Sequence, residues 1–203
     1  MNSPVARLFG AGRFVLLAML LGLTLAGCGV NNIPTQEEAA KAKWSQVLNQ
    51  YQRRADLIPN LVETVKGYAK QEAQVLEAVV AARARATSVQ VPADIVTNPD
   101  AFKKFQEAQS QLSASLGRLL AISENYPDLK SNQNFLALQS QLEGTENRIS
   151  VARRDYIEAV QAYNTELRTF PGVIWASTLY KGNKPMETFT IAEETKRPPQ
   201  VKF

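Results

Sequence analysis

Apolar residues recur at alternating steps of three and four positions over three long stretches of the chain. This spacing places one apolar stripe along a helix, and such a stripe is buried against partner helices. The first stretch predicts a helix from about Thr35 to about Thr87, and only Glu72 interrupts its stripe. The stripe consists of Trp44, Leu48, Tyr51, Ala55, Ile58, Val62, Val65, Ala69, Leu76 and Val79.

Two local signals belong to this first helix. Pro34 should block helix formation until about Thr35, and Thr35 forms a capping box with Glu38 three residues later. Pro59 falls inside the apolar pattern, where a proline removes one hydrogen bond and costs about 3 kcal/mol. We therefore expect a kink or a break near residues 55–59, with the stripe in phase on both sides.

Two further helices follow. Asn98, Pro99 and Asp100 supply a capping side chain, a proline at the first helical position and an acid in the first turn. They predict a second helix that continues to about Tyr126, and a third pattern runs over residues 131–170. The stripes consist of Phe102, Phe105, Leu112, Leu116 and Leu119 in the second helix and of Phe135, Leu138, Leu142, Ile149, Ala152, Tyr156, Ala159, Tyr163, Leu167 and Phe170 in the third.

These patterns together predict the fold class. Short connections place neighbouring helices in antiparallel pairs, so we expect an all-α fold: an elongated antiparallel up-and-down bundle of three to four long helices over residues 36–182. Within it, residues 171–180 predict a short C-terminal helix. Residues 183–203 predict an extended tail, whose apolar side chains are available to dock on the bundle: Phe189, Ile191, Val201 and Phe203.

The N-terminus has a different pattern. Arg7 and Arg13 precede an uncharged apolar run over residues 14–27, which is shorter than the roughly 20 residues that span a bilayer. A charged leader, a short apolar run and small residues at its end are typical of a secretory signal peptide. We predict that residues 1–27 are such a signal peptide and are cleaved.

The leader ends in Leu25-Ala26-Gly27-Cys28, which resembles the lipobox of bacterial lipoproteins. In that motif the cysteine is alkylated by a diacylglycerol and becomes the first residue of the mature chain. Cys28 is therefore the predicted lipid-attachment site, and residues 28–35 are the predicted tether. Two or three acyl chains anchor a protein stably, whereas one binds only marginally. An uncleaved membrane anchor is the alternative that the sequence leaves open.

The expected location is thus on a membrane, outside the cytoplasm. Gly29, rather than an aspartate, follows the cysteine. In lipoproteins with this motif, that choice favours the outer membrane, facing the periplasm, if the source has two membranes. The whole chain has 23 basic and 19 acidic residues, and this weak positive charge does not argue for a nucleic acid partner.

The composition also excludes much catalytic chemistry. The chain has no histidine and one cysteine, which removes Ser-His-Asp triads, Cys-His nucleophiles and zinc sites built on imidazole. No phosphate-binding or dinucleotide-binding glycine motif is present. We predict a non-enzyme without a cofactor or metal. Two acid pairs on helical faces leave a glycoside-hydrolase type of site as a remote alternative: Glu143 with Glu146, and Asp155 with Glu158.

Two polar clusters interrupt the apolar helices. If the helices are antiparallel, the clusters face each other as a charged layer that serves as a docking site for a partner or fixes the helix register. The alternative is ordinary surface charge, with pairs worth about 0.2–0.5 kcal/mol each. One cluster consists of Arg53, Arg54, Asp56, Asn60 and Glu63, and the other of Glu143, Glu146, Asn147, Arg148, Arg153 and Arg154. Five aromatic residues at helical spacing line either a ligand slot or the core: Trp44, Tyr51, Tyr68, Tyr156 and Tyr163.

Three stretches resemble the LemA family of bacterial membrane-anchored helical proteins. They are GVNNIPTQEEAAKAKWSQVLNQYQRRADLIPNLVETVKGYA (29–69), LQSQLEGTENRISVARRDYIEAVQAYN (138–164), and the ending with FPGVIWAS and RPPQVKF. The resemblance implies an α-helical, extracytoplasmic, N-terminally anchored protein, and it carries no catalytic set. The chain departs from the family in having Lys70-Gln71-Glu72 where a histidine and glutamate are common, and Tyr156-Ile157 where Tyr-Asn is favoured.

Three functions remain open at this point. The first is a non-enzymatic scaffold or adaptor lipoprotein that presents a helical surface to other envelope proteins. The second is a self-assembling structural or membrane-remodelling protein, for which homo-oligomers are expected. The third is the carboxylate-dependent hydrolase of envelope polymers. The expected partners are therefore membrane lipid, through the acylated N-terminus, and envelope proteins.

Overall fold

The computed structural model describes residues 29–190. The predicted signal peptide, Cys28 and the tail residues Ile191, Val201 and Phe203 lie outside the described residues. Within them the chain forms helices and no strand, so the prediction of an all-α fold is confirmed. The elements are α2 (Asn32–Tyr68), η1 (Lys70–Glu72), α3 (Ala73–Ser88), η2 (Ile95–Thr97), α4 (Pro99–Ser123), α5 (Pro127–Lys130), α6 (Gln133–Glu166) and α7 (Gly172–Thr178).

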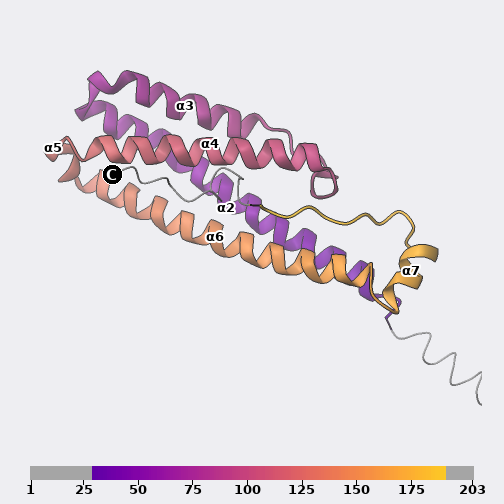
Figure 1. Cartoon of the computed structure of the whole chain (residues 1–203). Coiled ribbons are helices and arrows are strands. Elements are labelled where there is room, and N and C mark those ends of the chain that lie inside the picture. The colour runs from indigo at the N-terminus through magenta and orange to yellow at the C-terminus, as the bar shows by residue number, and fades with distance from the viewer. Residues whose placement is uncertain (1–28, 191–203) are drawn as a thin grey trace, which may run out of the picture.

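The four long helices run alternately in opposite directions (Figure 1). α2 begins at the end of the molecule that carries α7, and α3 returns from the far end. α4 then runs back to the far end, and α6 leads again to α7. α2 packs chiefly against α6 and also against α3, and α3 packs against α4.

The first helix is shorter than predicted, and its expected continuation to Thr87 is wrong. α2 ends at Tyr68, where Ala69 leaves the helical region with φ −126° and ψ 54°. A short 3-10 turn then reverses the chain, and α3 folds back along α2. Leu76 and Val79 are nevertheless buried beside Val65. The apolar spacing therefore continued across a turn because both helices bury their stripes in one core.

The predicted capping box at Thr35 is also wrong. α2 begins at Asn32, and the amide of Thr35 already donates to the carbonyl oxygen of Asn31 (3.1 Å). Pro34 lies within the first turn, where its missing N–H would have no intrahelical partner in any case. Glu38 accepts from Lys41 Nζ at 3.0 Å instead of capping the helix.

Pro59 does not break α2, which is continuous from Asn32 to Tyr68. A proline leaves the carbonyl four residues earlier without its helical donor, and here that carbonyl belongs to Ala55. Arg83 of α3 supplies the missing donor, because its Nε lies 2.8 Å from the oxygen of Ala55. The interior proline is thus accommodated by a neighbouring helix.

The starts of the other long helices follow the sequence signals more closely. Asn98 caps α4, and its Oδ1 accepts from the amide of Ala101 (3.1 Å). Asn132 caps α6 in the same way through the amide of Phe135 (3.0 Å). Side chains that satisfy orphan amides at a helix start stabilise it by about 1 kcal/mol.

The core divides into two hydrophobic clusters along the rod. The cluster nearer α3 holds mainly aliphatic side chains of α2, α3, α4 and α6, such as Ile58, Leu119 and Leu142. The other cluster, nearer α7, is rich in aromatic residues. α3 ends at Ser88 and does not cover the aromatic cluster, so residues 183–190 lie along it and bury Met186 and Phe189.

Candidate functional site

Arg54 is the centre of a polar layer between the two hydrophobic clusters. Its side chain is only 1% exposed. Tyr51 and Ile58, on either side of it in α2, belong to different clusters, and Phe105 and Leu112 bracket Gln109 of α4 in the same way. The layer therefore crosses the bundle at one level.

The guanidinium of Arg54 links α4 to α6. Its Nη1 donates to Glu146 Oε1 (2.8 Å) and to Ser113 Oγ (2.7 Å), and its Nη2 donates to Gln109 Oε1 (2.6 Å). The guanidinium carbon also lies 5.0 Å from the ring centre of Tyr51. Gln109 in turn donates to the carbonyl oxygen of Ala86 in α3 (3.4 Å). Arg54 and its partners thus connect all four long helices.

Of the two polar clusters named from the sequence, the structure brings together only Arg54 and Glu146, as an ion pair in which the arginine is buried and the glutamate is half exposed. Arg53 and Asn147 are exposed. The remaining members make local contacts: Asp56 accepts from Gln52, Asn60 from Thr64 through its carbonyl, Glu63 pairs with Lys66, and Glu143 accepts from Gln139. Arg153 lies over the ring of Phe189, Arg154 lies near Asp155 and Glu158, and Arg148 lines a shallow hollow between α2 and α6.

Sequence reasoning missed three residues of this layer. Gln109, Ser113 and Arg83 were not singled out, although the first two lie on α4 and the third on α3. Gln109 carried one usable signal, since it occupies a position between Phe105 and Leu112 on the predicted apolar stripe. Arg83 carried none, because its partner is a backbone oxygen released by a proline of another helix.

The aromatic residues form core, not a ligand slot. Trp44 lies 5.3 Å from both Phe105 and Tyr156, measured between ring centres, and 6.0 Å from Phe189. Tyr51, Tyr156 and Tyr163 are also buried, whereas Tyr68 is 44% exposed and accepts from Asn132 (2.8 Å). Burial raises the pKa of the Tyr156 phenol well above its usual range, and its hydroxyl donates to the carbonyl oxygen of Glu187 (2.8 Å).

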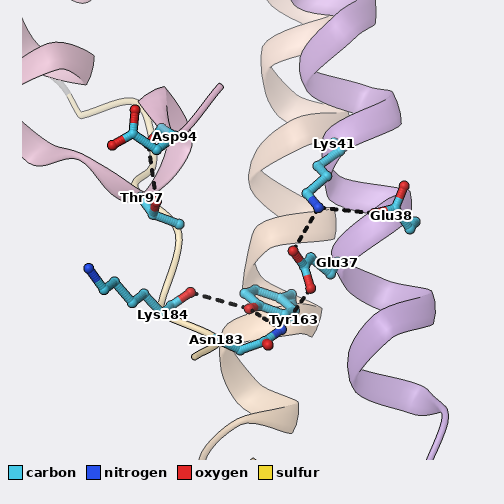
Figure 2. Close-up of polar contacts among 8 residues, drawn as sticks. All are labelled: Glu37, Glu38, Lys41, Asp94, Thr97, Tyr163, Asn183 and Lys184. Atoms are coloured by element: carbon cyan, nitrogen blue, oxygen red, sulfur yellow. Dashed lines mark hydrogen bonds and ion pairs between the residues drawn. The ribbon is translucent and has the colours of Figure 1, made fainter. Parts of the chain in front are cut away.

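A polar pocket of about 440 Å³ lies at the α7 end, between the start of α2 and residues 182–184. Figure 2 shows Glu37 between Lys41 and Asn183: Lys41 Nζ is 2.7 Å from its Oε1, and Asn183 Nδ2 donates to its Oε2 (2.7 Å). The Tyr163 hydroxyl donates to the carbonyl oxygen of Lys184 (3.2 Å). Burial raises the pKa of Tyr163, and the bonds to Glu37 and Glu38 raise that of Lys41.

Several carboxylates near the polar layer and the pocket are engaged in structural contacts. Glu146 is held by Arg54, Asp155 by Lys43 (3.2 Å), and both oxygens of Glu37 have donors. Within residues 29–190, no group of three or more acid or thiol side chains is arranged to hold a metal ion. The layer around Arg54 and the pocket at Glu37 can therefore hold helices in register and bind polar groups, and neither presents a free acid and base pair.

Among the described residues, no helix combines the length and the apolar character needed to cross a membrane. The α7 end of the rod exposes several large apolar side chains, of which Phe170 is 81% and Leu179 65% exposed. The start of α2 lies against the same end. Asn32 Nδ2 donates to Glu166 Oε1 at 3.3 Å, and a Cβ at Gly29 would lie 3.3 Å from Pro171 Cγ.

Comparison with known proteins gives distant relatives. The model of the LemA family matches residues 43–203. The chain is 26% identical over 157 residues to magnetosome proteins MamQ 1 and MamQ 2 of Paramagnetospirillum magneticum, covering 70% of this chain and 58% of each relative. It is 24% identical over 186 residues to magnetosome protein MamQ of Magnetospirillum gryphiswaldense, covering 84% of this chain and 67% of that protein. The chain thus spans less than two thirds of the first two relatives.

Proposed function

Since this chain belongs to the LemA family, we propose that it is a non-enzymatic envelope protein, anchored by lipid at Cys28, that serves as a helical scaffold or adaptor for other envelope proteins. The names of the three magnetosome relatives state no reaction. Together with the engaged carboxylates, this supports the non-catalytic class. The outer membrane, on its periplasmic side, is the proposed location if the source has two membranes.

One observation supports the proposal: α2 begins at one end of the rod, and the turns that join α2 to α3 and α4 to α6 lie at the opposite end. α2 begins beside α7, one short step after Cys28, and the turns at residues 69–72 and 124–132 lie at the other end (Figure 1). With 37 residues at about 1.5 Å each, α2 alone is about 55 Å long. A rod held at one end presents its far end to proteins well away from the membrane surface.

The proposal is tested in cells with the full chain. A photo-crosslinking amino acid replaces the exposed Gln71 at the far end, and matched variants carry it at the exposed Ser150 on the side of α6. We expect the Gln71 form to capture one defined envelope protein, and we expect the capture to fail when Cys28→Ala removes the lipid. Metabolic labelling with a clickable fatty acid reports lipidation of Cys28 independently.

Three outcomes would contradict the proposal or a part of it. Capture only of a second copy, from Gln71 or Ser150, favours the self-assembling structural protein. Capture that is equal with and without the lipid means that the anchor does not serve the adaptor role. Labelling of the Cys28→Ala form with fatty acid would show that the lipid is attached elsewhere.

A further inference from the structure

The α7 end carries an apolar surface of a kind found nowhere else on the described residues. We call it the α7 face and define it by Phe170, Val173, Ile174 and Leu179, which are 81%, 42%, 45% and 65% exposed. The other exposed large apolar residues among the described ones are separated along the chain, as at Val80, Leu136 and Val151. Single exposed apolar side chains are ordinary. Four of them in the ten residues of one helix and its flanks, at one end of the rod, make this end a candidate interaction surface.

α7 has apolar side chains on its outward side as well as on its inward side. Its inward positions are Gly172, Trp175 and Ala176, which are buried or pack against the aromatic cluster. A helix on the surface of a water-soluble bundle usually turns polar side chains outward. Here the outward positions are Val173 and Ile174 in the first half of the helix and the polar Ser177 and Thr178 in the second. The first half of α7 therefore exposes apolar side chains that have no partner within the described residues.

The chain segment that carries the α7 face contains basic residues and no acidic ones. Residues 167–185 contain Arg168, Lys181 and Lys184 and no acid, and none of these three forms an ion pair among the described residues. Two acids lie near this segment. Glu37, on the pocket that Lys184 also lines, is paired with Lys41 and bonded to Asn183. Glu166 accepts from the neutral amide of Asn32, so one negative charge stands against three positive ones. Asp94, exposed, lies on the far side of that pocket.

An apolar face with a rim of cations matches the surface of a lipid bilayer that contains anionic lipids. Apolar side chains enter the boundary between headgroups and acyl chains, and each nearby Lys or Arg contributes about 1 kcal/mol at an anionic surface. A soluble protein that bound the α7 face would itself have to present an apolar centre surrounded by acidic residues. The site of attachment favours the bilayer, since Cys28 is joined directly to Gly29, which lies against Pro171.

We propose that the α7 face inserts into the interfacial layer of the bilayer, with Arg168, Lys181 and Lys184 at anionic headgroups, and so holds the rod upright. The upright orientation rests on the lipid anchor of the proposed function, whereas the affinity of the face for lipid does not. Once Cys28 is anchored, the contact becomes intramolecular, and even weak insertion is populated. The anchor then supplies attachment and the α7 face supplies orientation.

The test places a nitroxide label on the full-length protein, reconstituted in vesicles of phosphatidylethanolamine and phosphatidylglycerol. Labels go on Ile174→Cys in the α7 face, on Gln71→Cys at the far end, and on Val151→Cys as the matched control for an exposed apolar position on the side. Accessibility to oxygen and to a water-soluble nickel complex gives the depth of each label. We expect Ile174 to lie about 5–10 Å below the headgroups, with Gln71 and Val151 in water.

A second arm tests the rim. Replacing Arg168, Lys181 and Lys184 by glutamine, or the phosphatidylglycerol by phosphatidylcholine, should bring the Ile174 label back toward water. Replacing Lys66, Lys70 and Lys103, which lie elsewhere, should leave its depth unchanged. Circular dichroism confirms that each variant is folded.

The outcomes separate this proposal from the proposed function. A lipidated protein whose Ile174 label is as accessible to nickel as Val151 overturns the α7 face and leaves the anchor intact. Magnetic broadening of the Ile174 label by a second label means that another copy covers the face, which also overturns it. If Cys28 is not lipidated, Cys28→Ala is combined with Ile174→Cys so that only position 174 carries the label, and the protein is added to the same vesicles. Immersion of the label then retains the α7 face without the anchor, and exposure rejects both.

Discussion

At the scale of single residues, Arg54 is the side chain on which the interior of the rod depends most. It is almost fully buried, and Glu146, its ionic partner, has a side chain that is 46% exposed. A buried cation without a counter-charge is costly, whereas a half-exposed carboxylate can be solvated. The contribution of the ion pair to stability should therefore be measurable by replacing Glu146 and leaving Arg54 in place.

We expect Glu146→Gln to lower the free energy of unfolding by about 1–3 kcal/mol, because it keeps an acceptor near Arg54 but removes the counter-charge. Glu143→Gln, one turn away on the same helix, is the control and should change stability by less than about 0.5 kcal/mol. Urea denaturation measures both. Equal effects at the two positions would mean that Arg54 needs no ionic partner.

Tyr156 gives a prediction about alkaline pH. Its folded pKa lies above the value in the unfolded chain, which is about 10, because burial disfavours the phenolate. Below pH 10 its contribution to stability is fully present. Above pH 10 the unfolded chain loses this proton while the folded chain keeps it, so the contribution is lost as pH rises toward the folded pKa.

Tyr156→Phe should accordingly show a shallower loss of stability above pH 10 than the wild type, by up to about 1.4 kcal/mol per pH unit. At neutral pH the variant should be less stable by about 0.5–1.5 kcal/mol, since it lacks the bond to the carbonyl of Glu187. Denaturation at pH 7, 10 and 11.5 checks both statements. Tyr68→Phe, at an exposed tyrosine, is the comparison variant, and parallel slopes for the two would contradict the prediction.

At the scale of secondary structure, Pro59 and Arg83 form a pair across two helices. In the wild type we expect Arg83→Met to cost about 0.5–1.5 kcal/mol, because the carbonyl of Ala55 loses its donor. In a Pro59→Ala background the cost should fall toward zero, because the restored backbone N–H replaces the guanidinium. A double-mutant cycle by urea denaturation measures this coupling; purely additive effects would show that Arg83 stabilises α3 in some other way.

The same scale shows what could be predicted from the sequence. The existence and the facing stripes of the helices followed from apolar spacing, and the start of α4 followed from its asparagine cap. The start of α6 was placed by its apolar pattern alone, and its cap, Asn132, was not singled out. The turn at residues 69–72 did not follow from the sequence, because the spacing of Leu76 and Val79 continues the stripe of α2 in phase. Apolar periodicity indicates which side chains are buried, but it does not show where the chain reverses direction between two helices.

The polar layer around Arg54 could be predicted only in part, for a related reason. The pairing of Arg54 with a carboxylate of the third predicted helix followed from assuming antiparallel helices with polar clusters at matching heights. Which carboxylate pairs depends on helix rotation, and this selects Glu146 and leaves Glu143 in solvent. Hydrogen bonds to backbone oxygens, such as the bond from Arg83 to the oxygen of Ala55, cannot be recognised from the pattern of side chains along the sequence.

At the scale of the whole molecule, the two halves of the rod have separate hydrophobic clusters, so a mutation in one cluster should destabilise mainly that half. Residues 183–190 complete only the half nearer α7, where Phe189 is 8% exposed and contacts Trp44, Phe102 and Tyr156. The other half is completed by α3. A defect in one half should therefore open that half first.

Phe189→Ala should destabilise the protein by about 3–5 kcal/mol and should raise amide hydrogen exchange more in residues 149–163 of α6 than in residues 135–145. Leu112→Ala, in the other cluster, should give the opposite distribution. Exchange measured by mass spectrometry on both variants distinguishes them. A uniform rise along α6 in both variants would show that the rod unfolds as one unit.

The contact between Trp44 and Phe189 also constrains the order in which the chain can fold during synthesis. The two rings come from near the beginning and near the end of the described chain, so the half of the rod nearer α7 lacks part of its core until almost every residue has emerged. Closing so long a loop is slow compared with forming local helices. The newly made chain therefore keeps its first helix incompletely packed until the last part of the described chain has been made.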